Sequence, residues 1–461
     1  MSGGGDARIR SLLGLRSLKS AEAIRLAVVV ALAIGAVLLV ESQKGGGHTS
    51  ASASLHPGQS APAQAGGSAG VSAPNGSGKQ SSGSAAVTVA GGPAVERAIR
   101  GGSMTVVIDQ PPSGLFAEQN RSIAQGATVA VDELNAHGGL AGHVHVKLVE
   151  ESLDGLSAPA VQAKLRSDAA AVLILPCDTD SQLSLAAAAS QFGMLMLAPC
   201  NPDGTAGGRY ATYWPVGVAA NEEALGLTSY MATEGKLSVF VVSAPGSRYI
   251  ELVTSDFQNA AQKRGIKIVG SASIALTTQD FSGLASAIRS AQPTPGAIFT
   301  ALPAPLANRM AAGLLAQGVR VPLIGSTAMD TPSTLSSGAK AVENATFSSY
   351  GFQRVSAPAS RFAADYRARF HNEPVGSFPG LGLETIRVLQ AAANKAHSAE
   401  PSAIQRALRS GIALEGVGLA HRSYAPDGNH NPVGAVSVSK IFAGSFLPLF
   451  VVDNPNGPPS P

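Results

Sequence analysis

Short apolar runs alternate with amphipathic stretches from residue 104 to about residue 326. MTVVID at 104–109 and AAVLILPC at 170–177 have the length and composition of strands, whereas 117–135 has helical periodicity and ends at a Gly-Gly pair. Strands that alternate with helices in this way predict parallel sheets covered by helices on both faces. Further strands are predicted at 143–151, 194–200, 237–243, 266–274, 296–302 and 321–326, and further helices at 158–167, 181–193, 249–264, 281–291 and 305–317.

Two series of this kind follow one another, which predicts an α/β fold with two lobes, each a parallel sheet flanked by helices. The first lobe is expected to comprise residues 103–218 and a return segment at 348–429, whose helical stretches RFAADYRARF and LGLETIRVLQAAANKA would cover the first sheet. The second lobe is expected to comprise 219–346 and 430–451, before a tail at 452–461. We expect a cleft between the lobes, where the carboxyl ends of both sheets converge on a ligand.

The N-terminal quarter of the chain has no such alternation. Residues 26–40 are free of charge, and extension to 23–41 gives nearly the ~20 residues of a membrane-spanning helix. Basic residues are concentrated before this segment, so residues 1–22 are expected in the cytoplasm and the rest outside. The alternative is a cleaved signal peptide, which would export the same domain. Residues 42–102, rich in Gly, Ser, Ala and Pro, are predicted to form a disordered linker.

Composition and motifs exclude several functions. A formal net charge of +3 over 461 residues, with the clustered positive residues near the N-terminus, makes nucleic acid an unsuitable partner. The globular region contains no HExxH, GxSxG, GxxxxGK[ST] or CxxC pattern, so we expect neither an enzyme nor a cofactor. His143 and His145 share one face of a predicted strand, but two imidazoles without a third ligand are more typical of a solvated strand than of a metal site.

The chain has two cysteines, Cys177 after the third strand and Cys200 after the fourth. Neighbouring strands lie ~4.8 Å apart, which would bring the two Cα atoms within disulfide range in an exported protein. We therefore predict a Cys177–Cys200 disulfide, with two buried free thiols as the alternative.

The order of these segments over residues 104–451 resembles the type I periplasmic binding proteins, especially those that bind leucine, isoleucine and valine for uptake transporters. The resemblance is carried by GATVAVDELNAHGGLAGHVHVKLVEESLD, by AAVLILPCDTDSQLSLAAAASQFGMLMLAPCNPD and by VRVPLIGSTAMD. In that family the bridge familiar from other members runs to the position of Leu153 here, so the Cys177–Cys200 pairing is not implied by the resemblance.

The resemblance also implies a ligand site. Loops after the third and fourth strands of the family offer hydroxyl and N–H groups to the ligand, and the second lobe offers an aromatic and an acidic residue. Here LPAPL occupies the place of the aromatic residue and GSTAMD that of the acidic residue. The acidic residue is therefore missing unless Asp330 reaches the cleft. The predicted ligand-binding residues are Gln119, Asp178, Thr179, Asp180, Cys200, Asn201, Tyr249, Ser326 and Thr327.

Some of these residues have a second interpretation. Asp180 or Ser181 would also suit the cap of the following helix, Gln119 could be a solvated helix residue, and Tyr249 could close the apolar face of its helix. The carboxylates at 178 and 180 would repel an anionic group, which favours a cationic, hydroxylated or neutral ligand.

The sequence thus predicts a membrane-tethered extracytoplasmic protein that binds a small polar solute, an amino acid or a related compound, for an ABC permease. The alternative is a ligand-sensing ectodomain that signals through a partner protein.

Overall fold

The computed structural model describes residues 92–336, 339–351, 357–414, 422–426 and 430–452. The predicted cytoplasmic segment and membrane segment, with most of the predicted linker, lie outside these residues. None of the helices that the structure describes is long and apolar enough to cross a membrane.

The first lobe, called lobe 1 below, is built on a five-stranded sheet in the order β2-β1-β3-β4-β5, in which every pairing is parallel. Strands β3 and β4 are buried along their whole length because helices lie on both faces of the sheet, which explains their continuous apolar sequences. The strands are β1 (Ser103–Asp109), β2 (His145–Glu151), β3 (Ala170–Ile174), β4 (Leu195–Ala198) and β5 (Tyr213–Pro215).

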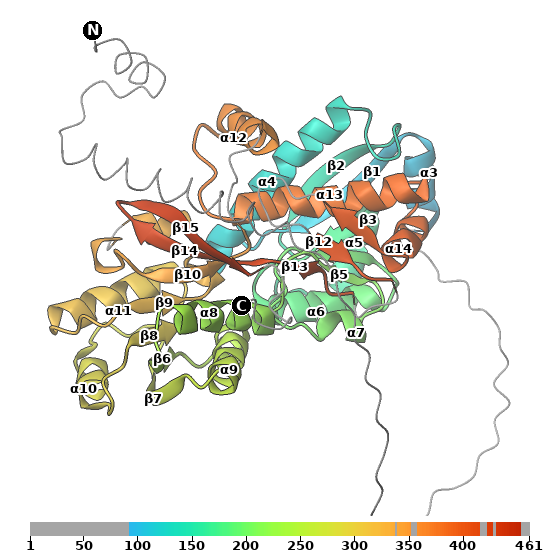
Figure 1. Ribbon diagram of the computed structural model, residues 1–461. Coiled ribbons are helices and arrows are strands. Elements are labelled where there is room, and N and C mark those ends of the chain that lie inside the picture. The colour runs from blue at the N-terminus through green and yellow to red at the C-terminus, as the bar shows by residue number, and fades with distance from the viewer. Residues whose placement is uncertain (1–91, 337–338, 352–356, 415–421, 427–429, 453–461) are drawn as a thin grey trace, which may run out of the picture. The chain divides into compact units, whose positions relative to one another are not determined.

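The helices of lobe 1 come from two separate parts of the chain (Figure 1). Helix α13 packs so closely on α4 that a Cβ atom at Gly126 would lie 1.8 Å from the Pro379 carbonyl oxygen, and one at Gly382 would lie 2.0 Å from that of Ile123. The helices are α3 (Gly92–Arg100), α4 (Ala117–Ala136), α5 (Ala158–Ser167), α6 (Thr179–Ser190), α7 (Ala206–Arg209), α12 (Ala357–Phe370), α13 (Phe378–Ala396) and α14 (Pro401–Arg409).

Lobe 2 contains a seven-stranded sheet in the order β15-β14-β10-β9-β8-β6-β7. Strands β6 to β10 pair in parallel. Strands β14 and β15 form an antiparallel hairpin, which is drawn in red beside β10 in Figure 1. The strands are β6 (Ser238–Ser243), β7 (Lys267–Ser273), β8 (Ala297–Thr300), β9 (Leu323–Gly325), β10 (Thr346–Ser349), β14 (Val436–Phe442) and β15 (Ser445–Val452).

Helices α8 (Ala220–Thr233), α9 (Arg248–Lys263), α10 (Ser282–Ser290) and α11 (Ala304–Ala316) belong to lobe 2. After β9 come the short 3-10 helices η1 (Thr327–Met329), η2 (Pro332–Leu335) and η3 (Ala339–Ala341). A small antiparallel sheet of β11 (Ile412–Leu414), β12 (Arg422–Tyr424) and β13 (Val433–Gly434) precedes the return of the chain to lobe 2 at β14.

The predicted two-lobed α/β fold is confirmed, with differences that include the following four. Residues 92–100, assigned to the disordered linker, form α3, whose Val95 and Ile99 are buried. Helix α8 had not been predicted, and the sheet of lobe 2 is mixed because β14 and β15 are antiparallel. Strand β10 ends at Ser349, so lobe 2 extends past the predicted boundary at 346.

Both lobes share one topology in their parallel strands. The order β2-β1-β3-β4-β5 in lobe 1 matches β7-β6-β8-β9-β10 in lobe 2. In such sheets the strand order reverses beside the first strand, and ligands bind at the carboxyl ends of the strands near that point. The segments that follow β1 and β3 in lobe 1, and β6 in lobe 2, are therefore the first places to look for a site.

Candidate ligand-binding site between the lobes

Direct contacts join the segments after β1 and β3 of lobe 1 to lobe 2. The Glu118 carboxylate accepts hydrogen bonds from the Ser333 backbone N–H (3.0 Å) and hydroxyl (2.5 Å). On the other side, the backbone N–H of Arg248 donates to Asp180 Oδ2 (3.4 Å), and the Arg248 guanidinium lies 3.6 Å from Asp203 Oδ2. The starts of α4, α6 and α9 thus lie at the surface where the two lobes meet, which we call the interlobe interface.

The start of α6 is held in place by several bonds. Asp178 is the cap of this helix, because its Oδ1 accepts from the Ser181 N–H (3.0 Å), so the expectation that Asp180 or Ser181 caps it is wrong. Asp180 is exposed in the first turn, and its only described role is the contact with Arg248. Thr179 is buried, yet its hydroxyl has no hydrogen-bond partner among the residues described.

The predicted disulfide is confirmed: Cys177 and Cys200 are bonded, with their Cα atoms 5.0 Å apart. The Gln182 Nε2 spans the same two loops, since it donates to the carbonyl oxygens of Pro176 and Cys200, each at 2.8 Å. The Cys177 N–H also donates to Asn120 Oδ1 (2.8 Å). A covalent bond and three hydrogen bonds therefore fix the loops after β3 and β4, and Cys200 has a structural role.

Asn201 is fully buried and is engaged by protein groups. Its Nδ2 donates to Asn431 Oδ1 (3.2 Å), and its Oδ1 lies 3.5 Å from the Tyr213 hydroxyl. Asn201 also forms a parallel bridge with Ala219, at the point where the chain passes into lobe 2. These contacts make Asn201 part of the connection between the lobes.

The three predicted residues of lobe 2 form one cluster. The Tyr249 hydroxyl lies 3.1 Å from Ser326 Oγ and 3.0 Å from Thr327 Oγ1, and all three side chains are buried. The Tyr249 ring meets Phe116 of lobe 1 edge to face, with 4.9 Å between ring centroids. Burial raises the pKa of the Tyr249 phenol well above its ordinary value, so this hydroxyl stays neutral.

Glu223 organises this cluster, and the sequence analysis missed it. Its carboxylate accepts hydrogen bonds from the Thr327 N–H (2.8 Å), the Thr327 hydroxyl (3.3 Å) and the Ser348 hydroxyl (2.5 Å). Burial raises the pKa of the Glu223 carboxyl, although these bonds oppose that effect. The signal in the sequence was the acidic pair Glu222-Glu223 in an otherwise apolar segment, on the helix that had not been predicted.

Asp330, the acidic residue that might have replaced the missing carboxylate, is committed elsewhere. It is buried and accepts hydrogen bonds from the Ser349 hydroxyl (2.7 Å), the Ser377 hydroxyl (2.5 Å) and the Ser377 N–H (3.1 Å). Ser377 precedes α13, so Asp330 of lobe 2 stabilises the start of a helix in lobe 1. Burial raises the pKa of Asp330 to about 7.

Three buried polar atoms at the interlobe interface lack a partner among the described residues. They are Gln119 Oε1, Thr179 Oγ1 and Ser247 Oγ, which belong to the starts of α4, α6 and α9. The Gln119 amide group reaches the other lobe, because its Nε2 lies 3.5 Å from the Ala328 carbonyl oxygen. Buried polar groups are nearly always hydrogen-bonded, so three such atoms at the carboxyl ends of two sheets are typical of a place where a polar ligand binds.

The described residues contain no group of three or more His, Cys, Asp or Glu side chains placed to hold a metal ion. His145 is exposed on β2, whereas His143 lies exposed in the turn before this strand, and its ring nitrogen bonds the nearby Ala141 carbonyl oxygen.

The sequence matches the family model for periplasmic binding proteins over residues 105–445, nearly the whole of both lobes. The chain belongs to the periplasmic binding protein family. This match confirms the type I resemblance proposed from the sequence. No curated protein is a match to this chain.

Solved structures of other binding proteins share the fold. The branched-chain amino acid binding protein LivJ of Streptococcus pneumoniae, in complex with isoleucine, is 19% identical, with a TM-score of 0.67 over 76% of this chain and 99% of its own. A solute-binding protein of R. palustris in complex with benzoate is 16% identical, with a TM-score of 0.65 over 77% of this chain and 96% of its own. The leucine-binding protein LivK of Thermotoga maritima is 19% identical, with a TM-score of 0.66 over 76% and 98%.

Proposed function

We propose that this binding protein captures a small polar solute between its lobes and delivers it to an ABC-type uptake transporter. The observation that carries the proposal is the set of unpartnered polar atoms of Gln119, Thr179 and Ser247 at the interlobe interface. A ligand that supplies hydrogen-bonding groups to them would remove the cost of burying them unpaired, about 1–3 kcal/mol for each group.

The neighbouring side chains narrow the chemistry of the solute. Phe116 and Tyr249 supply aromatic surface beside the polar atoms, while Glu223 and Asp330 are occupied by hydroxyl and N–H donors of the protein. Neither of these two carboxylates is thus prepared to pair with a ligand ammonium group. We propose a compact solute with an apolar or aromatic body and neutral or hydroxylated polar groups.

The lobes must separate to admit a solute. The Glu118–Ser333 and Arg248–Asp180 contacts join the lobes. We propose that these contacts open by hinge motion near Gly351 and Ala219 and close again around the solute, as in domain closure generally.

A binding screen with the full chain tests the proposal. Benzamide and 4-hydroxybenzyl alcohol, whose polar groups are neutral, are screened by thermal shift beside leucine, isoleucine, benzoate, 4-hydroxybenzoate and 3,4-dihydroxybenzoate. A ligand at 100 times its dissociation constant stabilises by ~2.7 kcal/mol. For the solute that binds, calorimetry should show about tenfold weaker binding to Thr179→Ala, equal to the loss of one hydrogen bond, and nearly unchanged binding to Thr179→Ser. Equal affinity for all three proteins would place the ligand elsewhere.

We further propose that the apolar segment 23–41 tethers the protein to the membrane, with residues 42–91 as a linker. This proposal rests on the charge-free run at 26–40 and on the basic residues before it. Alkaline extraction of membranes from cells that express the full chain should leave the protein in the membrane pellet, whereas a chain that starts at residue 45 should be released. Release of both would indicate a cleaved signal peptide or no anchor.

A further inference from the structure

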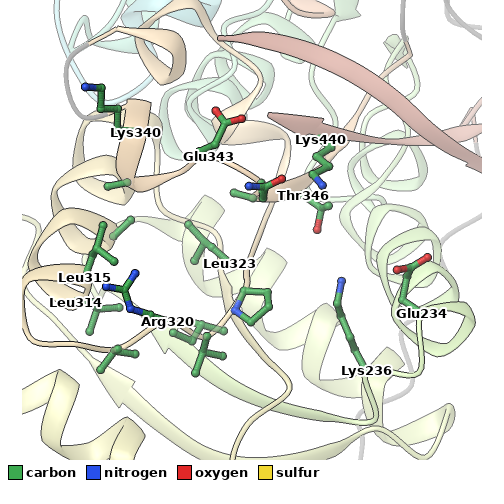
Figure 2. Close-up of a pocket in the computed structure, with 18 of the residues that line it drawn as sticks. Glu234, Lys236, Leu314, Leu315, Arg320, Leu323, Lys340, Glu343, Thr346 and Lys440 are labelled. Carbon is green, nitrogen blue, oxygen red and sulfur yellow. The ribbon is translucent and has the colours of Figure 1, made fainter. Parts of the chain in front are cut away.

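Lobe 2 has a cavity at the end of its sheet where the parallel strands begin. The interlobe interface lies at the other end, where these strands finish. The cavity has a volume of about 570 Å³ and is lined by residues near the amino ends of three strands, Ile298 of β8, Leu323 of β9 and Thr346 of β10 (Figure 2). Strand β9 is only three residues long, and Ser326 and Thr327 follow it at the interlobe interface. One short strand therefore separates this cavity from the Glu223 cluster.

The ammonium groups of Lys236 and Lys440 both line the cavity. The Lys236 ammonium lies over the Tyr230 ring, 5.1 Å from its centroid. Thr346 also lines the cavity and is the direct register partner of Lys440 in the β10–β14 pair. Paired residues of an antiparallel ladder point to the same face of the sheet. In Figure 2 the Lys236 and Lys440 side chains accordingly extend toward one another from opposite sides.

The charges of the lining residues are unbalanced. Four basic residues line the cavity against two acidic ones, and the structure, over the residues it describes, records no ion pair for any of the four. Of the two acids, Glu343 is used locally, since its Oε1 accepts a hydrogen bond from the Ala443 N–H (2.8 Å). The basic residues are Lys236, Arg320, Lys340 and Lys440.

The inner side of the cavity is apolar. Ammonium groups beside such a surface are partly shielded from water, so an anion that reaches them gains more than it would at an open surface. Contact of an alkyl or aryl group with the apolar residues would add about 25 cal/mol for each Å² of apolar surface buried. The buried apolar residues of the lining are Ile298, Ala311, Leu314, Val319, Leu323 and Ala345.

We propose that this cavity, which we call the basal cavity, binds a small organic anion, with one carboxylate or phosphate group between Lys236 and Lys440 and a short apolar body against Leu314 and Leu323. The site is separate from the interlobe interface and goes beyond the proposed transport function. An anionic head pairs with the two ammonium groups at once and removes their mutual repulsion, which an uncharged ligand of the same shape cannot do.

Calorimetry on the full chain with four probes tests the chemistry. Hexanoate and hexyl phosphate should bind, hexanamide should bind at least about tenfold more weakly because it lacks the charge, and inorganic phosphate should bind more weakly than hexyl phosphate because it lacks the apolar body. The ratio of hexanoate to hexyl phosphate shows which head group the cavity prefers. Equal binding of hexanoate and hexanamide, or of phosphate and hexyl phosphate, would overturn the proposal.

Variants locate the probe. Lys236→Gln and Lys440→Gln should each weaken hexanoate binding about tenfold. Lys267→Gln, which removes an equal charge from an exposed position of the same lobe outside the cavity, should leave it unchanged. Circular dichroism melting curves establish that each variant is folded. If Lys440→Gln does not fold, Lys440→Arg is used in its place; it keeps the charge and should retain binding. The proposal fails if Lys267→Gln weakens binding as much as the cavity variants do, or if Thr179→Ala weakens it, since the latter would place hexanoate at the interlobe interface.

Discussion

The two sides of the interlobe interface are built in opposite ways. On lobe 1 the loops after β3 and β4 are fixed by the Cys177–Cys200 disulfide and by Gln182, yet the Thr179 hydroxyl between them has no partner among the described residues. On lobe 2 the hydroxyls of Ser326 and Thr327 are already bonded within the protein, to Tyr249 and Glu223. A ligand would therefore meet unpartnered groups of Gln119 and Thr179 on lobe 1. On lobe 2, where Ser247 Oγ also lacks a described partner, Ser326 and Thr327 must exchange existing bonds for ligand bonds.

This difference suggests an order of events. A rigid surface with unsatisfied groups binds a ligand without reorganisation, so the solute should dock first on lobe 1. Lobe 2, whose Ser326 and Thr327 hydroxyls are bonded without ligand, should close afterwards. The variants below test the comparison, beginning with the largest expected effect.

Glu223→Ala should lower the free energy of unfolding by about 4 kcal/mol. The substitution leaves the Thr327 N–H and the Ser348 hydroxyl buried without an acceptor, each at a cost of about 1–3 kcal/mol, and adds a small cavity. Glu223→Gln keeps an oxygen acceptor and should lose about 1 kcal/mol. Urea unfolding followed by circular dichroism measures both. Losses below about 1 kcal/mol for the alanine variant would show that lobe 2 does not depend on this carboxylate.

Removal of the disulfide with Cys177→Ala and Cys200→Ala should cost about 3 kcal/mol, the typical value for a bridge between positions 23 residues apart. Reduction of the parent by a thiol should give the same loss, which separates the bond from the side-chain change. The double variant should also bind the solute more weakly, because the loops of lobe 1 lose their fixed geometry. Unchanged affinity would contradict the idea that lobe 1 is preorganised by this bond.

Asp330→Asn should change how stability depends on pH. The folded-state pKa of Asp330 is about 7, above the ordinary 3.8, so the folded protein retains a proton that the unfolded chain releases. The stabilisation is complete below pH 4 and is lost as the pH rises through 7. Between pH 4 and 7 the free energy of unfolding of the parent should fall by about 3 kcal/mol more than that of Asp330→Asn.

The measurement is a series of urea unfolding curves from pH 4 to 8. Asp109, whose pKa is raised by burial to about 6, contributes with the same sign in both proteins and cancels in the difference. Parallel curves for the parent and the variant would show that Asp330 titrates normally.

The smallest effect is the most direct test of the contrast between the lobes. Thr179→Ala removes a buried methyl group and a hydroxyl that has no described protein partner, so it should cost only the methyl group, about 1 kcal/mol. Thr327→Ala removes the same methyl group and a hydroxyl near Tyr249 and Glu223, so it should cost about 1–2 kcal/mol more. Thermal unfolding of the two variants, without ligand, gives the comparison, and equal losses would remove the distinction between prepared and occupied hydroxyls.

Much of the fold could be predicted from the sequence because it depends on local patterns. Apolar runs that repeat with helical segments specify parallel strands and covering helices, and the Cys177–Cys200 bridge followed from the adjacency of β3 and β4. Helix α8 was missed because its apolar positions continue directly from the preceding strand and loop without a clear break. The antiparallel hairpin β14–β15 could not be distinguished from parallel strands, since strand direction depends on pairing partners far apart in the chain.

The sequence by itself determined which residues lie at the carboxyl ends of the strands, and hence most of the candidate site. Only the tertiary structure decided which of their polar groups are free, because hydrogen-bond partners come from distant segments: Glu223 and Ser348 for lobe 2, and Asn431 for Asn201. For the same reason Asp330, which the sequence offered as a ligand group, is bonded to Ser377 near the start of α13. The basal cavity likewise could not be predicted from the sequence, since Lys236 and Lys440 line the same cavity only because β14 pairs with β10.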